Sequence, residues 1–367
     1  MLGSQRHLFE IPREVAYLDA AAFSALPGVV REAGREGVLA KVRPWAMARD
    51  DAMAERVRAD AARLVGAAPD DIALVGAVSH GIATAARNLD LPAGSRILRI
   101  ADEFPSLTLV FDRLAAERGL ALDIVARPAE GDWTAAILAA IARPGPPLAL
   151  AALTPLHWSD GALIDLDRVV PAVRAAGGAV VIDATQAVGV LDIDVARLRP
   201  DFLAFPTYKW VLGPYSLAFL YAAPSRQQGL AIEENGGNRP GGGFAPGARR
   251  YDRGERNDPI GLPMAAAGME LVAGWGRAAI AARLRALTDA LAGVARGLGL
   301  EVLPDARRAP HILGVRLPGG MRPGLIEALA ARGAYASDRL GVLRISPHVW
   351  ADEEDVARFA AALRALI

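Results

Sequence analysis

Short apolar runs alternate with longer stretches rich in alanine and arginine between about residue 70 and residue 222. The apolar runs predict strands at residues 72–75, 96–100, 121–125, 148–153, 179–182, 202–205 and 217–221. The stretches between them predict helices at residues 81–89, 107–118, 133–142 and 166–176. Strands that alternate with helices are typical of a mostly parallel sheet covered on both faces, which binds ligands beyond the carboxyl ends of its strands.

The alternation stops near residue 232, where a loop rich in glycine, proline and arginine extends to residue 258. Loops this long inside a compact protein are usually functional or part of an interface. The rest of the chain predicts helices at 263–297 and 353–366 and short strands near 312–317 and 342–346. We therefore predict an α/β fold divided into an N-terminal arm (1–18), a large domain (19–245) and a smaller C-terminal α+β domain (246–367).

Charge and composition restrict the classes of partner. The 367 residues include 41 basic and 41 acidic side chains without a block of like charge, which argues against nucleic acid and anionic membranes as partners. The N-terminus lacks the apolar region of a signal peptide, and no apolar run is long enough to span a bilayer. Because cysteine is absent, disulfides and thiolate metal sites are excluded, and we predict a cytoplasmic enzyme without a metal site.

Lysine is nearly absent from this arginine-rich chain. Of the 41 basic residues only Lys41 and Lys209 are lysine. Arginine replaces lysine in most ion pairs, but its guanidinium stays protonated and cannot act as a nucleophilic amine. Lys209 follows the predicted strand at 202–205, and Asp183 ends the one at 179–182. A lysine that can form a Schiff base and an acid at neighbouring strand ends are what a pyridoxal phosphate site requires.

Five segments in this order resemble the class V aminotransferase family of fold-type I pyridoxal phosphate enzymes. The segments are residues 17–22 (YLDAAA), residues 75–82 (VGAVSHGI), Asp183 with Gln186, Tyr208 with Lys209, and residues 343–346 (LRIS). The family includes cysteine desulfurases, selenocysteine lyases and isopenicillin N epimerase-like members. The resemblance implies pyridoxal phosphate as cofactor, an amino acid as small-molecule substrate, and a homodimer with both subunits lining the site.

The resemblance also implies roles for the residues at the strand ends. Lys209 would hold the cofactor as an aldimine, and Asp183 would keep the pyridine nitrogen protonated. Gln186 would bond to the 3′-oxygen of the cofactor. The alternatives are a helix N-cap for Asp183 and an exposed helical side chain for Gln186.

Phosphate binding is implied for residues at two places in the chain. Ser79, and after it His80, would bind the phosphate at the start of a helix, where free backbone N–H groups and the helix dipole attract anions. The alternative for Ser79 is a plain N-cap. Thr207 and Tyr208 could also reach the phosphate, although desulfurases usually carry histidine at the latter position.

Three further positions match the family's ring-stacking, 3′-oxygen and carboxylate sites. Phe104 would stack on the pyridine ring, where many desulfurases have histidine. His157, or its neighbour Trp158, falls where the family usually has an asparagine near the 3′-oxygen. Arg344 matches the clamp for the substrate α-carboxylate, which a bidentate guanidinium suits; a surface ion pair is the alternative.

Residues 250–257 correspond to a loop that in the family reaches across a dimer interface toward the phosphate of the partner. This chain has Glu255 where the family often has threonine. A carboxylate repels phosphate, so Arg256 or Asn257 could serve instead, and a solvated charged loop is the alternative.

These observations predict a pyridoxal phosphate enzyme that acts on an α-amino acid through Lys209 and is aminotransferase-like. Without cysteine, the persulfide relay of a desulfurase cannot operate, and Phe104 and Tyr208 give weaker acid assistance than histidines. A β-eliminating C–S lyase or an epimerase is the alternative within the family. A non-catalytic binding protein is the alternative of another class, although such a protein would be expected to lose Lys209 or Asp183.

Overall fold

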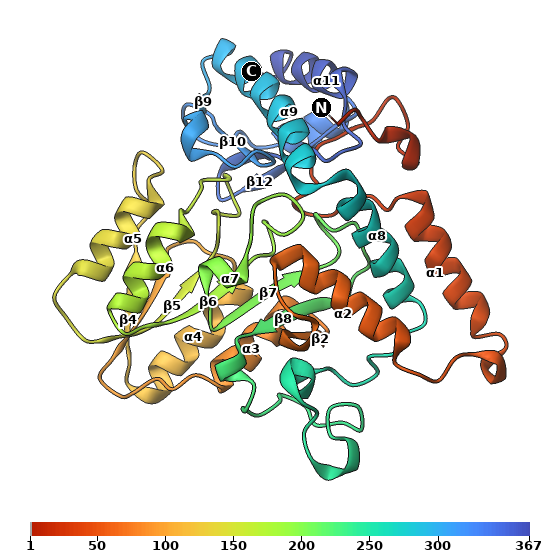
Figure 1. Cartoon of the computed structure of the whole chain (residues 1–367). Helices are drawn as coiled ribbons and strands as arrows, with labels where there is room; N and C mark the ends of the chain where they lie inside the picture. Colours follow the sequence, from red (N-terminus) through yellow and green to blue (C-terminus); the bar gives the residue numbers. More distant parts are fainter. Residues whose placement is uncertain (1) are drawn as a thin grey trace.

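A computed structural model describes residues 2–367, and its centre is a seven-stranded sheet with the strand order β2-β8-β7-β6-β5-β3-β4 (Figure 1). The strands are β2 (Ile72–Val75), β3 (Arg96–Ile100), β4 (Ala121–Val125), β5 (Leu148–Leu153), β6 (Ala179–Asp183), β7 (Phe202–Pro206) and β8 (Ala218–Ala222). Neighbours from β4 to β7 run parallel, and only β8 is antiparallel to its two neighbours. The predicted mostly parallel α/β sheet is therefore confirmed.

Helices cover both faces of this sheet, so most of its strands are buried on both sides. The helices α3 (Val78–Arg87) and α4 (Pro105–Arg118) pack on one face, around a core that includes Ile82 and Phe111. The other face is covered by α2 (Ala52–Val65), α5 (Trp133–Ala142), α6 (Leu166–Ala175) and α7 (Val195–Leu198). The resulting double-sided burial explains why the strands form continuous apolar runs in the sequence.

A smaller four-stranded sheet with the order β12-β13-β10-β9 forms the C-terminal region, at the top of Figure 1. Its strands are β9 (Glu301–Val302), β10 (Leu313–Arg316), β12 (Ser337–Arg339) and β13 (Val342–Ile345). The helices of this region are α9 (Arg277–Gly297), α10 (Leu325–Ala330) and α11 (Glu353–Arg364). No helix within residues 2–367 combines the length and apolar character needed to cross a membrane.

The N-terminal segment joins the small region. Strand β1 (Ala16–Tyr17) pairs in parallel with β11 (Ala334–Tyr335), and Asp19 forms a bridge with Ser346 just after β13. Figure 1 shows both chain ends beside this region. Residues of the family-like segment 17–22 are thereby held against β13, which carries Arg344.

Helices α1 (Gly28–Ala40) and α8 (Gly261–Trp275) pack together beside the large sheet, on the right of Figure 1. Gly276, at a φ of 78°, separates α8 from α9 within the helical pattern. Since α8 also packs on α2, it lies with the large sheet, and the domain limits at residues 245 and 246 stay a prediction. Short 3-10 helices occupy Arg6–Leu8, Pro44–Ala46, Pro69–Asp71, Pro224–Arg226, Pro240–Gly242, Gly247–Tyr251 and Asp305–Arg307.

Candidate active site

A cavity of about 270 Å³ opens beyond the carboxyl ends of β6 and β7, at the N-terminus of α3. Besides Trp158, the alternative to His157, six of the residues singled out in the sequence line this cavity: Ser79, Phe104, Asp183, Gln186, Tyr208 and Lys209. They come from four segments separated by up to 130 positions in the chain (79 to 209). The sheet order brings these segments to one edge, as expected for an α/β fold of this class.

Lys209 lies three residues beyond the end of β7 and is almost fully buried. Burial, followed by the charge of Arg344, lowers the pKa of its amine to about 7. Near neutral pH a large share of the amine is therefore unprotonated, which is the form that attacks a carbonyl carbon.

Asp183 is the last residue of β6, and its Oδ1 accepts a hydrogen bond from the backbone N–H of Thr185 at 2.9 Å. Burial raises the pKa of this carboxyl, whereas the charge of Lys209 opposes the shift. No helix begins here, so the N-cap alternative does not apply. A buried carboxyl with a raised pKa favours a cationic ligand that would keep it ionised.

Gln186 faces the cavity with its amide already oriented by two hydrogen bonds. Its Oε1 accepts from the indole N–H of Trp210 at 2.8 Å, and its Nε2 donates to the carbonyl of Ala21 at 3.1 Å. Gln186 is therefore not an exposed helical side chain, because its amide is buried and held by these two hydrogen bonds.

Ser79 lies in the first turn of α3, whose N-cap residue is Ala77. Because the helix begins at Val78, earlier than the sequence pattern indicates, Ser79 is not the N-cap, and it lines the cavity instead. Its neighbour His80 is half-buried and does not line the cavity. Of these two residues, the structure brings only Ser79 to the cavity, and its binding of a phosphate stays a prediction.

Two aromatic side chains form another wall. The rings of Phe104 and Trp158 meet edge to face with centroids 5.4 Å apart, and the amine of Lys209 lies 5.9 Å from the Phe104 centroid. The turn that presents Phe104 includes Asp102 at a φ of 56°, a conformation uncommon outside glycine.

The prediction of His157 at the cofactor requires correction. Its ring is completely buried, stacks on Trp133 with centroids 5.3 Å apart and contacts the guanidinium of Arg127. Burial lowers the pKa of His157 to about 4. The next residue, Trp158, lines the cavity in its place, and its ring stacks on that of His157 with centroids 6.4 Å apart.

Thr207, for which phosphate binding is predicted, does not line the cavity. Its side chain is fully buried, and its hydroxyl lies 2.5 Å from the carbonyl of Pro214, within the turn that follows Lys209. Tyr208 does line the cavity, with its ring stacked on Tyr215 at 4.3 Å between centroids.

Arg344 lies behind the cavity wall rather than on it. Its Nη1 donates to the carbonyl of Trp158 at 3.2 Å and its Nη2 to Oδ1 of Asp19 at 3.1 Å. Ser337 donates to the same oxygen of Asp19 at 2.9 Å. The surface ion pair considered as an alternative is therefore a buried one, and burial lowers the pKa of Arg344 to about 10.

Glu103 is a wall residue that the sequence patterns did not single out. One carboxylate oxygen accepts from the backbone N–H of Phe104 at 2.6 Å, and the other is buried without a hydrogen-bond partner within residues 2–367. Burial raises the pKa of Glu103 to about 8. The only signal in the sequence was its position next to Phe104.

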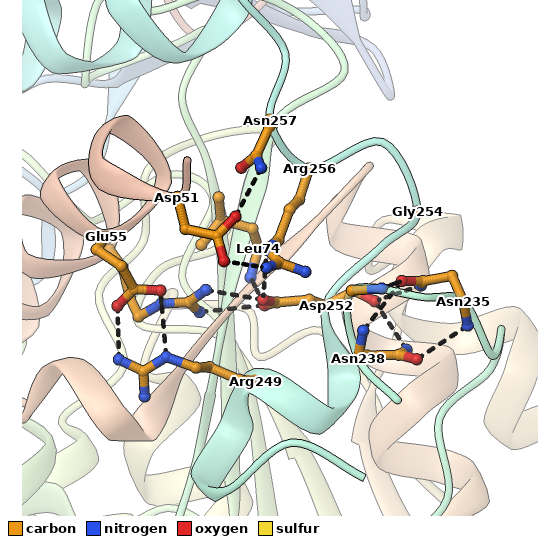
Figure 2. Close-up of polar contacts among 12 residues, drawn as sticks. Asp51, Glu55, Leu74, Asn235, Asn238, Arg249, Asp252, Gly254, Arg256 and Asn257 are labelled. Atoms are coloured by element: carbon orange, nitrogen blue, oxygen red, sulfur yellow. Dashed lines mark hydrogen bonds and ion pairs between the residues drawn. The ribbon is translucent and has the colours of Figure 1, made fainter. Parts of the chain in front are cut away.

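The loop at residues 232–258 is fastened to the outer edge of the large sheet. Asp252 accepts a hydrogen bond from the backbone N–H of Leu74 in β2, as Figure 2 shows, and the backbone N–H of Arg253 donates back to Leu74. Arg256 and Asn257 both bind the carboxylate of Asp51. Contact of this loop with a partner subunit stays a prediction.

Comparisons with known proteins agree with this geometry. Residues 16–359 match the family model described as aminotransferase class-V. The chain belongs to the class V aminotransferase family. It is 32% identical to an isopenicillin N epimerase from Streptomyces clavuligerus over 333 residues, which cover 85% of this chain and 84% of that protein. The resemblance predicted from the motifs is confirmed.

Solved structures agree on the fold of this family member. A cysteine desulfurase from Thermococcus onnurineus NA1 matches with a TM-score of 0.85 at 22% identity, covering 99% of this chain and 97% of that one. A cystine C–S lyase in complex with its product cysteine persulfide matches with a TM-score of 0.84 at 20% identity, covering 95% and 97%.

Pyridoxal phosphate is the cofactor of the class V aminotransferase family, and the cavity fits it. The amine of Lys209, with its lowered pKa, and the carboxyl of Asp183, with its raised pKa, face one space. The start of α3 offers that space free backbone N–H groups beside Ser79. These are complementary to an aldehyde, a pyridine nitrogen and a phosphate, respectively.

Proposed function

We propose that this protein is a pyridoxal phosphate-dependent enzyme that acts on an α-amino acid, with aminotransferase-like chemistry. The observation that carries the proposal is the buried amine of Lys209, with a pKa lowered to about 7, in a cavity shared with Asp183. Pyridoxal phosphate, when bound, supplies an electron sink that stabilises a carbanion at the substrate Cα.

Residues of the chain would bind the cofactor and the substrate and transfer the proton. Asp183, as a carboxylate, stabilises positive charge on the pyridine nitrogen, and Ser79 with the N-terminus of α3 binds the phosphate. Phe104 stacks on the ring. Arg344 binds the α-carboxylate of the substrate, and this contact would add to the hydrogen bond that Arg344 donates to Asp19 or replace it. With the cofactor and substrate bound, the free amine of Lys209 would take the proton from Cα and return one.

The distribution of proton carriers supports transamination. Lys209 is the basic amine at the cavity, and the walls formed by Phe104 and Trp158 offer aromatic rings, which cannot transfer protons. Transamination needs one base that moves a proton between Cα and the cofactor carbon on a single face. Epimerisation needs an acid on the opposite face as well.

Epimerisation is the second candidate, because one observation favours it. Glu103 lies beside Phe104 on the cavity wall, with its pKa raised to about 8, so its carboxyl holds a proton at neutral pH. The similarity to a protein named isopenicillin N epimerase supports the same reading.

One experiment tests both candidates. Purified protein loaded with pyridoxal phosphate is incubated with single L-amino acids in deuterated water, without a keto acid. We expect the cofactor to be recovered in its pyridoxamine form by mass spectrometry. Accumulation of the deuterated D-amino acid would establish epimerisation instead, and release of pyruvate and ammonia with the cofactor still in its aldehyde form would establish β-elimination. If no amino acid exchanged its Cα proton, the proposal of an amino-acid enzyme would be wrong.

The attachment of the cofactor is tested separately. Borohydride reduction followed by peptide mass spectrometry should place the cofactor mass on the peptide that contains Lys209. Lys209→Ala should remove this adduct, whereas Lys41→Ala, which changes the other lysine of the chain, should leave it in place.

We further propose that the protein works as a homodimer. Helix α1 and the segment after it expose Val38, Leu39, Val42 and Trp45, and the last two are 69% and 77% exposed. A run of exposed apolar side chains is typical of an interaction surface. Light scattering after size-exclusion chromatography measures the mass directly, and a mass of 38.5 kDa at micromolar concentration would contradict this proposal.

A further inference from the structure

The hairpin of β12 and β13 places a second arginine on the same face as Arg344. In the antiparallel register Ser337 lies opposite Arg344, and Arg339 lies opposite Val342. Directly paired residues of antiparallel strands project from the same face of a sheet, so Arg339 and Arg344 are diagonal neighbours on that face. Diagonal positions lie about 7–8 Å apart, within reach of two long side chains.

The turn of this hairpin fixes the position of Arg339. Leu340 and Gly341 connect the strands, and both have positive φ values, of 57° and 77°. Two central residues with positive φ are the signature of a two-residue type I′ turn, which sets the register of the flanking strands. A leucine in this conformation is strained, so the tight turn is maintained at a cost in backbone energy.

The shared face of the hairpin lies against the N-terminal segment and against Trp158 of the cavity wall, to whose carbonyl Arg344 donates a hydrogen bond. Ser337 and Arg344 both donate hydrogen bonds to Oδ1 of Asp19, which locates this face against the N-terminal segment. Arg344 and Arg339 both lower the pKa of Lys209, and Arg339 also lowers the pKa of Arg344. The guanidinium groups of Arg339 and Arg344 therefore lie close enough to act electrostatically on each other and on the amine of Lys209.

The acidic groups nearby leave Arg339 without a partner. Asp19 forms its ion pair with Arg344. Within residues 2–367 no carboxylate pairs with Arg339, and its side chain donates one hydrogen bond, to the carbonyl of Asp338 at 3.2 Å. Like charges on one face of a sheet repel, so an anion placed beside both guanidinium groups would be stabilised.

Lack of a carboxylate partner does not by itself indicate function. Arg332 is exposed, donates only to the carbonyl of Ala328 and has no carboxylate partner either. Arg339 differs because it is half-buried, lies diagonally opposite Arg344 and acts electrostatically on Lys209. Arg332 is for this reason the appropriate control.

We propose that Arg339 is a specificity residue that binds a second anionic group, a carboxylate or its sulfonate analogue, on the side chain of the amino-acid substrate. The inference rests on the proposed function, in which Arg344 binds the α-carboxylate. A substrate with two anionic groups would then contact both guanidinium groups of the hairpin face. Amino acids with neutral side chains would leave Arg339 unpaired and bind more weakly.

Non-reacting dicarboxylates test this inference without turnover. Isothermal titration calorimetry of the cofactor-loaded protein compares succinate, glutarate and adipate with the monocarboxylates of the same chain length. We expect at least one dicarboxylate to bind more tightly than its monocarboxylate. Arg339→Gln should weaken that dicarboxylate about 10- to 100-fold, the usual effect of losing a hydrogen-bonded charge pair, without changing the monocarboxylate. Arg332→Gln should change neither.

The outcomes separate this inference from the function on which it rests. Equal affinity of the wild-type protein for all matched pairs, or an unchanged dicarboxylate affinity in Arg339→Gln, would overturn the second anionic site. If Arg339→Gln weakened the binding of monocarboxylates and dicarboxylates equally, the inference would be overturned as well. Arg339 would then affect only the carboxylate that both kinds of ligand share. If Arg344→Gln left the affinity for every carboxylate unchanged, the proposed substrate site itself would be wrong.

Discussion

Replacing Asp252 by alanine should destabilise the protein strongly, because it removes the buried one of the two carboxylates that pair with the buried guanidinium of Arg58. The carboxylate of Asp252 receives two hydrogen bonds from Arg58, at 3.1 and 2.7 Å, and the two side chains are 0% and 1% exposed. Removing one partner of such a pair typically costs about 3–5 kcal/mol. Glu55 keeps a hydrogen bond to the Nε of Arg58, so we expect a value near the lower end, about 3 kcal/mol.

Urea unfolding measures this effect, with a lower midpoint at an unchanged slope as the expected result. Glu270→Ala is the matched control, because it removes an exposed ion pair with Arg56, which should contribute less than about 1 kcal/mol. A double variant, Arg58→Met with Asp252→Leu, should be more stable than Asp252→Ala, since it removes both charges together.

Two results would refute this reasoning. If Asp252→Ala and Glu270→Ala had the same midpoint, burial of the Arg58 charge would not be the source of the cost. If the double variant were less stable than Asp252→Ala, packing and not charge would dominate. Asp252→Ala and the double variant both lose the hydrogen bond that Asp252 accepts from the Leu74 N–H. The cost of this loss therefore cancels when the two variants are compared.

Three further predictions concern the site and the interface. Lys209→Met should stabilise the cofactor-free protein most at and below about pH 7 and progressively less toward pH 10, because the unfolded chain binds the lysine proton up to its ordinary pKa of 10.5 whereas the folded chain releases it near 7. A pH-independent difference in unfolding free energy would contradict this. Arg344→Lys should raise KM for amino acids at least tenfold while leaving amines without a carboxylate unaffected, as steady-state kinetics can show. Val42→Asp should lower the mass in light scattering to that of one chain, whereas Lys41→Asp, at the preceding position, should have a smaller effect.

The fold could be predicted closely because each strand of the large sheet is buried on both faces. Such strands form short continuous apolar runs, and the predicted run at residues 96–100 coincides with β3. Helix starts were less certain: α3 begins at Val78, ahead of the predicted residue 81, because its N-cap is Ala77, which carries no side-chain signal.

Site residues at strand ends could be predicted from the sequence, whereas site residues in turns could not. Lys209 and Asp183 follow or end apolar strands, so their positions depend only on the sheet. His157 and Trp158 lie in a turn, where the direction of each side chain depends on backbone dihedrals that apolar periodicity does not encode. Glu103 was missed because a buried carboxyl in a loop has no sequence pattern of its own.

The charges around Lys209 connect its reactivity to the small C-terminal sheet. Arg344, which lowers the pKa of Lys209, lies on β13, and Asp19 holds its guanidinium in place through a hydrogen bond. Asp19 is itself fixed by the bridge to Ser346 on the same segment. Any movement of this sheet away from the cavity would carry Arg344 with it and raise the pKa of the amine toward its ordinary value. The pKa of the Lys209 amine therefore depends on the small sheet and the N-terminal segment as well as on its burial at the large sheet.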